Sequence, residues 1–350
     1  MGVSDASDSR LAALTHWVVE DLGFADSSIE PASADASFRR YFRLTRGADT
    51  HIIMDAPPAQ EDVAPFVSVA RALAAMHLNV PIVLARDVAQ GFLLLSDLGS
   101  RLYLDELNAR RALGDGDAID RLYAQALHAL VIMQTAGGTA ARALPPYDRA
   151  LLMREMELFP EWFLGRHMRI SIGDAERRML DRLFDALAQA ALSQPAAFVH
   201  RDYHSRNLLL TQDNSPGILD FQDAVSGPIT YDAVSLLKDC YIAWPAQRVR
   251  GWALAYREQL LRAGIPGGPD EAAFMRWFDL MGLQRHIKVL GIFARLYYRD
   301  GKPGYLKDLP RVLDYTRAAA SGYAETAEFA EFIAQHIDPT FGAAQTSVKA

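Results

Sequence analysis

The sequence predicts an α+β protein with two lobes, a small antiparallel sheet lobe followed by a larger and mostly helical lobe. Short apolar runs separated by turn residues fill the first 97 residues, which is the pattern of a small sheet. From about residue 100 onward, apolar residues recur at helical spacing except within the segment 198–220. We therefore expect a first lobe over residues 1–97, a connector at residues 96–99 and a second lobe over residues 100–350.

The first lobe combines both kinds of element. Helical periodicity predicts helices at 10–22 and 61–76, and short apolar runs predict strands at 38–44, 51–55, 82–84 and 92–95. The first helix ends before Gly23, a residue that favours helix C-termini. Residues 31–37 are small and polar, and we expect them to form a flexible loop ahead of a hairpin.

The second lobe is expected to be helical almost throughout. Segments with helical spacing of apolar residues lie at 122–133, 153–163, 176–192, 231–241, 248–263, 271–298 and 306–323. Their aromatic residues, for example Trp162, Trp252 and Phe293, are expected in the core, because large apolar side chains are mostly buried.

The segment between these helices carries a motif with a chemical meaning. It contains His200-Arg201-Asp202, then Asn207, a predicted hairpin through Asn214-Ser215-Pro216-Gly217, and finally Asp220-Phe221. The order H-R-D-x-x-x-x-N, hairpin, D-F is typical of kinase-type phosphoryl transfer. A chance H-R-D tripeptide is common, but the ordered combination predicts function.

The chemistry of phosphoryl transfer requires these residue types. Charge on the transferred phosphoryl group calls for a divalent metal, and Mg²⁺ takes a few oxygen ligands from the protein and keeps several waters. The predicted hairpin brings Asn207 and Asp220 together as candidate metal ligands. Asp202 is then the candidate catalytic base that accepts the proton of the attacking hydroxyl.

With this motif placed, the two predicted lobes match a protein-kinase-like architecture. The loop and hairpin of the first lobe are expected to lie over ATP, which makes Ser37, Arg40 and Arg43 candidate nucleotide contacts. The connector, which includes Ser96, Asp97 and Leu98, is the expected hinge whose backbone meets the adenine.

Composition excludes several other classes of protein. A net charge of −7 argues against a nucleic-acid partner, since such partners need a clustered basic face. The single cysteine, Cys240, excludes an internal disulfide framework and fits a reducing cytoplasm. The acidic, polar start is unlike a signal peptide, and no uncharged apolar run is long enough to cross a membrane. We expect a cytoplasmic monomer without a membrane partner.

Taken together, these segments resemble the aminoglycoside phosphotransferase and choline kinase-like family over roughly residues 10–330. Within it, the segments DASFRRYFRL, MDAPP, FLLLSDLG, FVHRDYHSRNLLL and GILDFQDAVSGPITYDAVSLLKD are similar to bacterial anomeric kinases for N-acetylmuramate and N-acetylglucosamine. The resemblance implies ATP- and Mg²⁺-dependent phosphorylation of the C1 hydroxyl, which yields sugar 1-phosphates for peptidoglycan recycling. It also implies that Asp232 braces the catalytic loop and that His200 orients its backbone.

One departure from the family pattern is the absence of a lysine before Lys238. Kinases of this type place a lysine on the strand predicted at 51–55, where it contacts the α- and β-phosphates, and Met54 stands near that position. The available cations are Arg39, Arg40 and Arg43, whose forked guanidinium groups suit phosphate oxygens. Our hypothesis is that Arg40 or Arg43 replaces the lysine.

For the sugar, the candidate contacts are the polar residues beside the base and the metal ligand: His204, Arg206, Gln222 and Asp223. The lactyl carboxylate of N-acetylmuramate calls for an arginine, and Arg166, Arg206 and Arg285 stay open as candidates. Two alternatives also remain. One is a kinase of the same fold that acts on an aminoglycoside, choline or homoserine. The other is a nucleotide-binding scaffold without catalysis.

Overall fold

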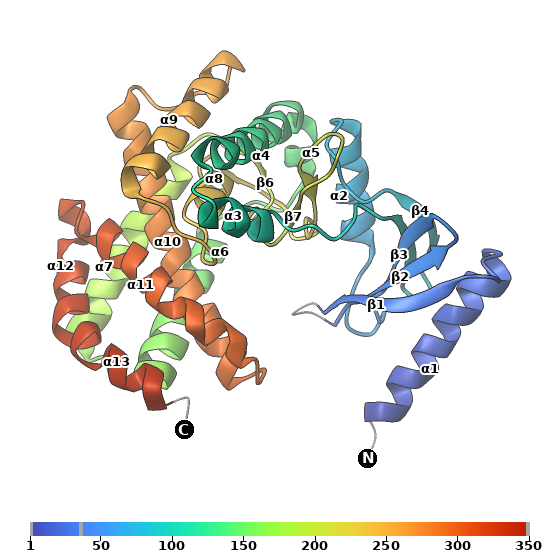
Figure 1. Cartoon of the computed structure of the whole chain (residues 1–350). Coiled ribbons are helices and arrows are strands. Elements are labelled where there is room, and N and C mark those ends of the chain that lie inside the picture. The colour runs from blue at the N-terminus through green and yellow to red at the C-terminus, as the bar shows by residue number, and fades with distance from the viewer. Residues whose placement is uncertain (1–2, 35–37, 348–350) are drawn as a thin grey trace. The chain divides into compact units, whose positions relative to one another are not determined.

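The computed structural model describes residues 3–34 and 38–347. The chain forms two compact units, one made of the residues up to Arg101 together with Leu209–Asp223, the other of Leu102–Leu208 and the residues from Ala224 onward. An antiparallel sheet dominates the first unit and helices dominate the second (Figure 1). The expected fold class is therefore confirmed. None of the helices over the described residues is both long enough and apolar enough to span a bilayer.

The first unit is built on a sheet with the strand order β1-β2-β3-β5-β4. Its strands are β1 (Ser28–Ala34), β2 (Arg40–Arg46), β3 (Asp49–Asp55), β4 (Val83–Asp87) and β5 (Phe92–Ser96), and neighbouring strands run antiparallel. The predicted strands at 38–44, 51–55, 82–84 and 92–95 correspond to β2 to β5. Each differs from the structure by a few residues at its ends.

Strand β1 was not expected, because residues 31–37 had been assigned to a flexible loop. In the structure residues 31–34 continue β1 and pair with β2, and the register shifts between Pro31 and Ser33. Proline and small residues disfavour strands, but an edge strand tolerates proline because one side of it makes no ladder hydrogen bonds. β1 is such an edge strand, so its position in the sheet overrides its weak local preference.

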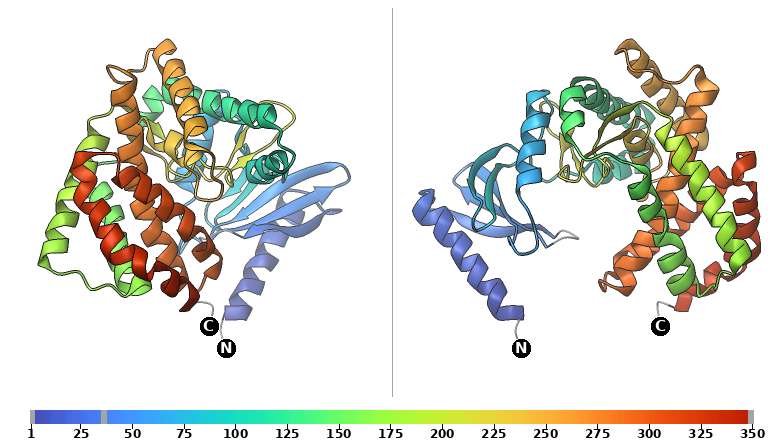
Figure 2. Two further views of the ribbon diagram at one scale, coloured as in Figure 1. Left: turned by 60° about the vertical axis from the view of Figure 1, so that its left-hand side comes forward. Right: turned by 180° about the vertical axis from the view of Figure 1, so that it is seen from behind.

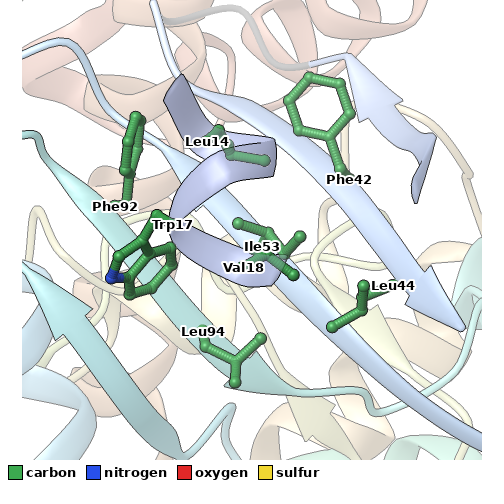
Figure 3. Close-up of a cluster of buried hydrophobic side chains, with 8 residues drawn as sticks. All are labelled: Leu14, Trp17, Val18, Phe42, Leu44, Ile53, Phe92 and Leu94. Carbon is green, nitrogen blue, oxygen red and sulfur yellow. The ribbon is translucent and has the colours of Figure 1, made fainter. Parts of the chain in front are cut away.

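A helix packs against one face of this sheet. The chain begins with α1 (Val3–His16), which continues into a π-helical turn (Trp17–Asp21). Figure 3 shows how side chains from this segment meet side chains from the sheet, and the buried cluster consists of Leu14, Trp17, Val18, Phe42, Leu44, Ile53, Phe92 and Leu94. Burial of this apolar surface holds α1 on the sheet.

The register of the sheet sorts its residues into two faces. Phe42 pairs with Ile53 and both belong to the cluster under α1, whereas Tyr41 pairs with Met54. Since successive residues of a strand point to opposite faces, Tyr41 and Met54 lie on the face away from α1. The second helix, α2 (Ala64–Ala75), lies on that other side of the sheet (Figures 1 and 2).

A small hairpin separates the two parts of the motif. Strand β7 (Leu208–Leu209) pairs with β8 (Gly217–Ile218) in a two-stranded sheet. A short connection of this kind returns the chain antiparallel. Asn207 immediately precedes β7 and Asp220 closely follows β8, so the predicted hairpin is confirmed and the two residues flank its open end.

The second unit is a helical assembly with a short two-stranded sheet, β6 (Ala196–Val199) and β9 (Val225–Pro228). Its α-helices are α3 (Tyr103–Ala112), α4 (Gly116–Ala136), α5 (Gly138–Ala143), α6 (Arg149–Met156), α7 (Asp174–Leu192), α8 (Tyr231–Leu237), α9 (Ala246–Arg262), α10 (Glu271–Tyr298), α11 (Leu309–Ala320), α12 (Ala327–Phe332) and α13 (Asp338–Ser347). Short 3₁₀ or π-helical segments are Phe159–Met168, Pro303–Asp308, Ala324–Thr326 and Ile333–Ile337.

Helix α10 is the central element of this unit. It contacts α6, α7, α8, α9 and α11, and it begins after Asp270, whose side chain accepts a hydrogen bond from the Ala273 N–H as an N-cap. The predicted helix at 271–298 has the same bounds as α10. Most of its residues are buried on all sides, so any charged residue on it needs a partner.

Candidate active site

The catalytic loop leaves β6 at Val199 and is held by a buried carboxylate. Asp232, at the start of α8, accepts hydrogen bonds from the peptide N–H of His200 at 2.6 Å and of Arg201 at 3.0 Å. Asp232 is fully buried, and burial raises its pKa to about 7 although these two hydrogen bonds act to lower it. The expectation that Asp232 braces the loop is confirmed.

The loop turns sharply at Arg201, whose φ of 75° lies in the left-handed region. A non-glycine residue in this region is held there by its surroundings. The Arg201 side chain reaches the carboxylate of Glu155 on α6 at 2.5 Å. The Lys288 ammonium on α10 lies 2.9 Å from the same carboxylate and donates to the Tyr231 hydroxyl at 3.0 Å.

These buried cations define the charge state of Asp202. Burial works to raise the pKa of the Asp202 carboxyl, but positive charge nearby outweighs it and keeps the pKa below its usual range. The largest contribution is that of Lys288, and Arg201 adds to it. Asp202 is only partly buried. It is therefore an ionised carboxylate that a substrate hydroxyl can reach, as a general base must be.

Hydrogen bonds within the loop set the direction of Asn207. The carbonyl of Asp202 accepts from the His204 N–H at 3.0 Å and from the Asn207 Nδ2 at 3.0 Å. Because the Nδ2 of Asn207 donates to this carbonyl, the Oδ1 oxygen of the same amide points away from it. An amide oxygen is a hard ligand of the type that Mg²⁺ accepts. The Nδ1 of His200 accepts from the Asp202 N–H at 3.3 Å, as expected for a residue that orients the backbone.

Asp220, the second predicted metal ligand, lies beyond the other arm of the hairpin with φ at +62°. Gln222 donates its Nε2–H to Oδ1 of Asp220 at 2.7 Å, which fixes the rotation of the carboxylate. Phe221 is buried and its ring packs on Phe66 of α2 at 4.9 Å between centroids. The amide of Asn207 and the carboxylate of Asp220 are the oxygen donors that suit a magnesium ion.

The predicted hinge borders a hollow in the first unit. This hollow, about 700 Å³ in volume, is lined by Asn79 and by residues 97–101 and 210–213. Ser96 does not line the hollow. Its N–H donates to the Ile82 carbonyl, and its hydroxyl oxygen accepts from the Ile82 N–H. The peptide N–H and carbonyl of Leu98 form no hydrogen bond with another described residue. Both groups can therefore bond to a ligand.

The arginines of the first unit fall on different faces of the sheet. Arg40 lies on the α1 face, where its guanidinium contacts the Phe42 ring and forms an ion pair with Asp55. Arg43 bonds to Asp97 at 2.7 Å and to the Gly99 carbonyl at 3.4 Å, so it braces the hinge. Its bond to Asp97 is the largest cause of the raised pKa of Arg43.

A third arginine lies beside the position of the missing lysine. Arg39 forms an ion pair with Glu61 at 3.2 Å, and both side chains are largely buried. Arg39 also bonds to Tyr41, the residue paired with Met54 on the face away from α1. The role of Arg39 beside Glu61 was not singled out from the sequence. Glu61 lies three residues before the start of α2, whereas the glutamate of a kinase lysine–glutamate pair lies on the helix itself, so the family pattern does not point to it.

The predicted sugar contacts occupy two separate settings. His204 and Arg206 both approach Tyr241, the first edge-on at 5.3 Å and the second over the ring at 4.6 Å. Gln222 is engaged with Asp220, and Asp223 is exposed. Of the predicted nucleotide contacts, Ser37 lies outside the described residues.

Comparison with known proteins identifies relatives over most of the chain. Residues 28–275 match the model of the phosphotransferase enzyme family, APH. A protein of Pseudomonas putida named N-acetylmuramate/N-acetylglucosamine kinase is 47% identical over 338 residues, 94% of this chain and 97% of that protein. Proteins of the same name from Pseudomonas aeruginosa (48%, 94% of this chain, 97% of that protein) and Neisseria meningitidis (41%, 91% and 93%) are also similar.

Solved structures share the fold at low sequence identity. The GDP complex of wild-type aminoglycoside 2'-phosphotransferase-IIIa matches with a TM-score of 0.58 and 17% identity, over 90% of this chain and 99% of that chain. Choline kinase LicA from Streptococcus pneumoniae matches with a TM-score of 0.58 and 11% identity, over 88% of this chain and 99% of that chain.

Proposed function

We propose that this chain, which belongs to the phosphotransferase enzyme family, transfers the γ-phosphoryl group of ATP to the C1 hydroxyl of N-acetylmuramate and N-acetylglucosamine. The observation that carries the proposal is its 41–48% identity, over more than nine-tenths of its length, to three kinases named for these two sugars. The ionised Asp202 on a rigid loop supports a phosphotransferase that acts on a hydroxyl group.

Each residue of the motif then has a role. Asp202 accepts the proton of the C1 hydroxyl, because its carboxylate is ionised and partly exposed. Asn207 and Asp220 hold Mg²⁺, which when bound supplies positive charge against the triphosphate. Asp232 and Glu155 do not touch the reactants; they fix the loop backbone and the Arg201 side chain. Positioning of this kind supplies a large part of catalysis.

The nucleotide is proposed to enter the hollow beside the hinge, where the peptide groups of Leu98 receive the adenine edge. Asp97 acts indirectly, since its carboxylate bonds to Arg43 and to the Gly99 N–H at 2.8 Å. Burial works to raise the pKa of Asp97, but these bonds outweigh it and leave the pKa below its ordinary value, so the Asp97–Arg43 pair keeps the hinge in shape as an ion pair.

We assign the place of the missing lysine to Arg39 and not to Arg40. Both stand at the start of β2, but Arg40 is held on the α1 face by Asp55, while Arg39 bonds to Tyr41 on the Met54 face. The Arg39–Glu61 pair has the composition of the cation–glutamate pair that organises phosphates in kinases. A phosphate contact for Arg40 stays an untested prediction.

The product would be a sugar 1-phosphate, suited to the recycling of cell-wall sugars, and we propose that the enzyme works in the cytoplasm as a monomer. The test is to incubate the protein with Mg²⁺ and ATP and each sugar, and to assay the product for a reducing end. Phosphorylation at C1 removes the reducing end and gives an anomeric phosphate signal in ³¹P NMR. A phosphorylated product that still reduces, or turnover only of choline, homoserine or aminoglycosides, contradicts the proposal. Turnover of nothing in that panel supports a non-catalytic scaffold.

A further inference from the structure

Helix α10 carries a buried arginine that forms no direct ion pair with a carboxylate of the described residues. Arg285 is only 4% exposed. Its one hydrogen bond to a described residue runs from Nη1 to the sulfur of Cys240 at 3.4 Å. Burial raises the pKa of the Cys240 thiol, so at neutral pH this partner is an uncharged thiol. The next cation along the helix, Lys288, is bonded to Glu155, which shows that α10 pairs its other buried charge.

Such an arginine is costly without an anion. A guanidinium carries five N–H donors in a planar fork, and a thiol is a weak acceptor for one of them. Burial of an unpaired charge costs several kcal/mol, so an anion that approached this guanidinium would be bound favourably. A carboxylate matches the fork with two parallel hydrogen bonds.

The surroundings of Arg285 are those of the catalytic loop. Burial works to lower the pKa of its guanidinium, and Cys240, Tyr231 and Asp202 are among the groups that outweigh it. Arg285 in turn is one of the charges that lower the pKa of His204, after burial itself. Geometry agrees with this: Cys240, the partner of Arg285, stands between Asp239, which accepts from the Ser205 N–H at 2.9 Å, and Tyr241, whose ring meets His204 at 5.3 Å.

Two buried polar atoms of the helical unit also lack hydrogen-bond partners among the described residues. The Nδ1 of His204 and the hydroxyl of Tyr315 are buried, and neither has a hydrogen-bond partner among the described residues. Tyr315 stacks on His286, the residue next to Arg285, at 4.8 Å between ring centroids. Residues i and i+1 of a helix point to different sides, so the Tyr315 ring does not mark the Arg285 side. Buried polar atoms are rarely left unpaired, so the Nδ1 of His204, on the catalytic loop, is a further donor or acceptor for a polar ligand.

We propose that Arg285 binds the lactyl carboxylate of N-acetylmuramate and so distinguishes this sugar from N-acetylglucosamine, which has no carboxylate. The inference rests on the proposed function, since it names the residue by which that site recognises one of its two sugars. The other arginines considered are less suited. Arg166 is exposed, and Arg206 is exposed and lies over the Tyr241 ring, where solvent weakens an ion pair.

The test compares three sugars: N-acetylmuramate, its lactyl methyl amide, which has the same shape without the charge, and N-acetylglucosamine. For Arg285→Met we expect kcat/KM for N-acetylmuramate to fall about 30-fold or more, because the carboxylate loses a buried charged partner. The values for the two uncharged sugars should fall equally and by a clearly smaller factor, because these sugars lose only the effect of Arg285 on Asp202 and not an ion pair. Arg285→Lys keeps the charge without the fork and should lie between the wild type and Arg285→Met.

Arg166→Met is the matched control and should keep the wild-type preference for the charged sugar. Turnover of N-acetylglucosamine by each preparation shows that the variant is folded, and Arg285→Lys serves if Arg285→Met is not. Equal losses for all three sugars, or an unchanged N-acetylmuramate value, overturn the inference and leave the proposed function intact. Wild-type protein that phosphorylates neither natural sugar contradicts the proposed function itself.

Discussion

The ammonium group of Lys288 lies 2.9 Å from the carboxylate of Glu155, inside the helical unit and far from it in sequence. The same carboxylate holds Arg201 at 2.5 Å and accepts a hydrogen bond from the Tyr147 hydroxyl. Burial works to raise the pKa of Glu155, and the charges of Lys288 and Arg201 outweigh it and lower that pKa. One glutamate therefore fixes two cations that both act on Asp202.

The first prediction concerns the acidic limb of the pH profile. Lys288 is the largest positive influence on Asp202, so Lys288→Met should raise the pKa of Asp202. In the wild type the depressed pKa keeps Asp202 ionised until the pH falls below the ordinary carboxyl value of about 3.9. The variant should lose kcat at a higher pH than the wild type, while kcat on the alkaline side is less affected.

Measurement of kcat against pH, with far-UV circular dichroism at each pH, checks this. Arg299→Met, at the exposed C-terminal end of the same helix, is the control. It should not shift the acidic limb of the profile of kcat against pH. An unshifted limb in a folded Lys288→Met protein shows that Lys288 does not act on the base.

The second prediction concerns the brace beneath the catalytic loop. Asp232→Ala removes the acceptor of two peptide N–H groups, at His200 and Arg201, and leaves them buried. Each unsatisfied buried group costs about 1–3 kcal/mol, so the loss of both should lower the unfolding free energy of the helical unit by about 2–6 kcal/mol. Asp232→Asn retains one acceptor oxygen and should lose less. Urea denaturation followed by circular dichroism measures both; equal stability of the two variants contradicts the role of the hydrogen bonds.

The third prediction separates the base from the metal ligand. Asp202→Asn keeps the shape of the side chain but removes its basicity, so turnover should fall by several orders of magnitude, about 10³-fold or more, while ATP binding persists. Asp220→Ala should instead abolish the Mg²⁺-dependent part of ATP binding. Calorimetry with and without Mg²⁺ together with steady-state kinetics measures both effects. Retained turnover in Asp202→Asn shows that another group accepts the proton.

Sequence reasoning succeeded where a strong local pattern agrees with the fold. Helix α10 was predicted with its bounds from the helical spacing of apolar residues over a long stretch, and the structure adds the N-cap at Asp270. The hairpin between Asn207 and Asp220 was predicted from its turn residues. Strand β1 was missed, because its pairing with β2 overrides the weak strand preference of Pro31 and its small neighbours.

The electrostatic supports of the candidate site could not be derived in the same way. The Lys288–Glu155 and Arg39–Glu61 pairs join residues from separate elements, and only packing reveals them. A partial signal existed in α10, where Arg285 and Lys288 interrupt an otherwise apolar stretch. Cations on a buried helix need anionic partners, but the sequence does not say which partner is a protein carboxylate and which is a ligand.

The last prediction compares the two arginines at the start of β2. Arg39→Met removes the cation beside Met54 and should raise the KM for ATP by about 10- to 100-fold, the effect of losing a charged contact to phosphate. Arg39→Lys keeps the charge and should restore part of this loss. Arg40→Met should leave the KM for ATP near the wild-type value, because Arg40 is on the α1 face and Asp55 retains its ion pair with Arg10. Its effect should be a modest loss of thermal stability. If instead Arg40→Met raises the KM for ATP and Arg39→Met does not, Arg40 binds the phosphates and the assignment of Arg39 is wrong.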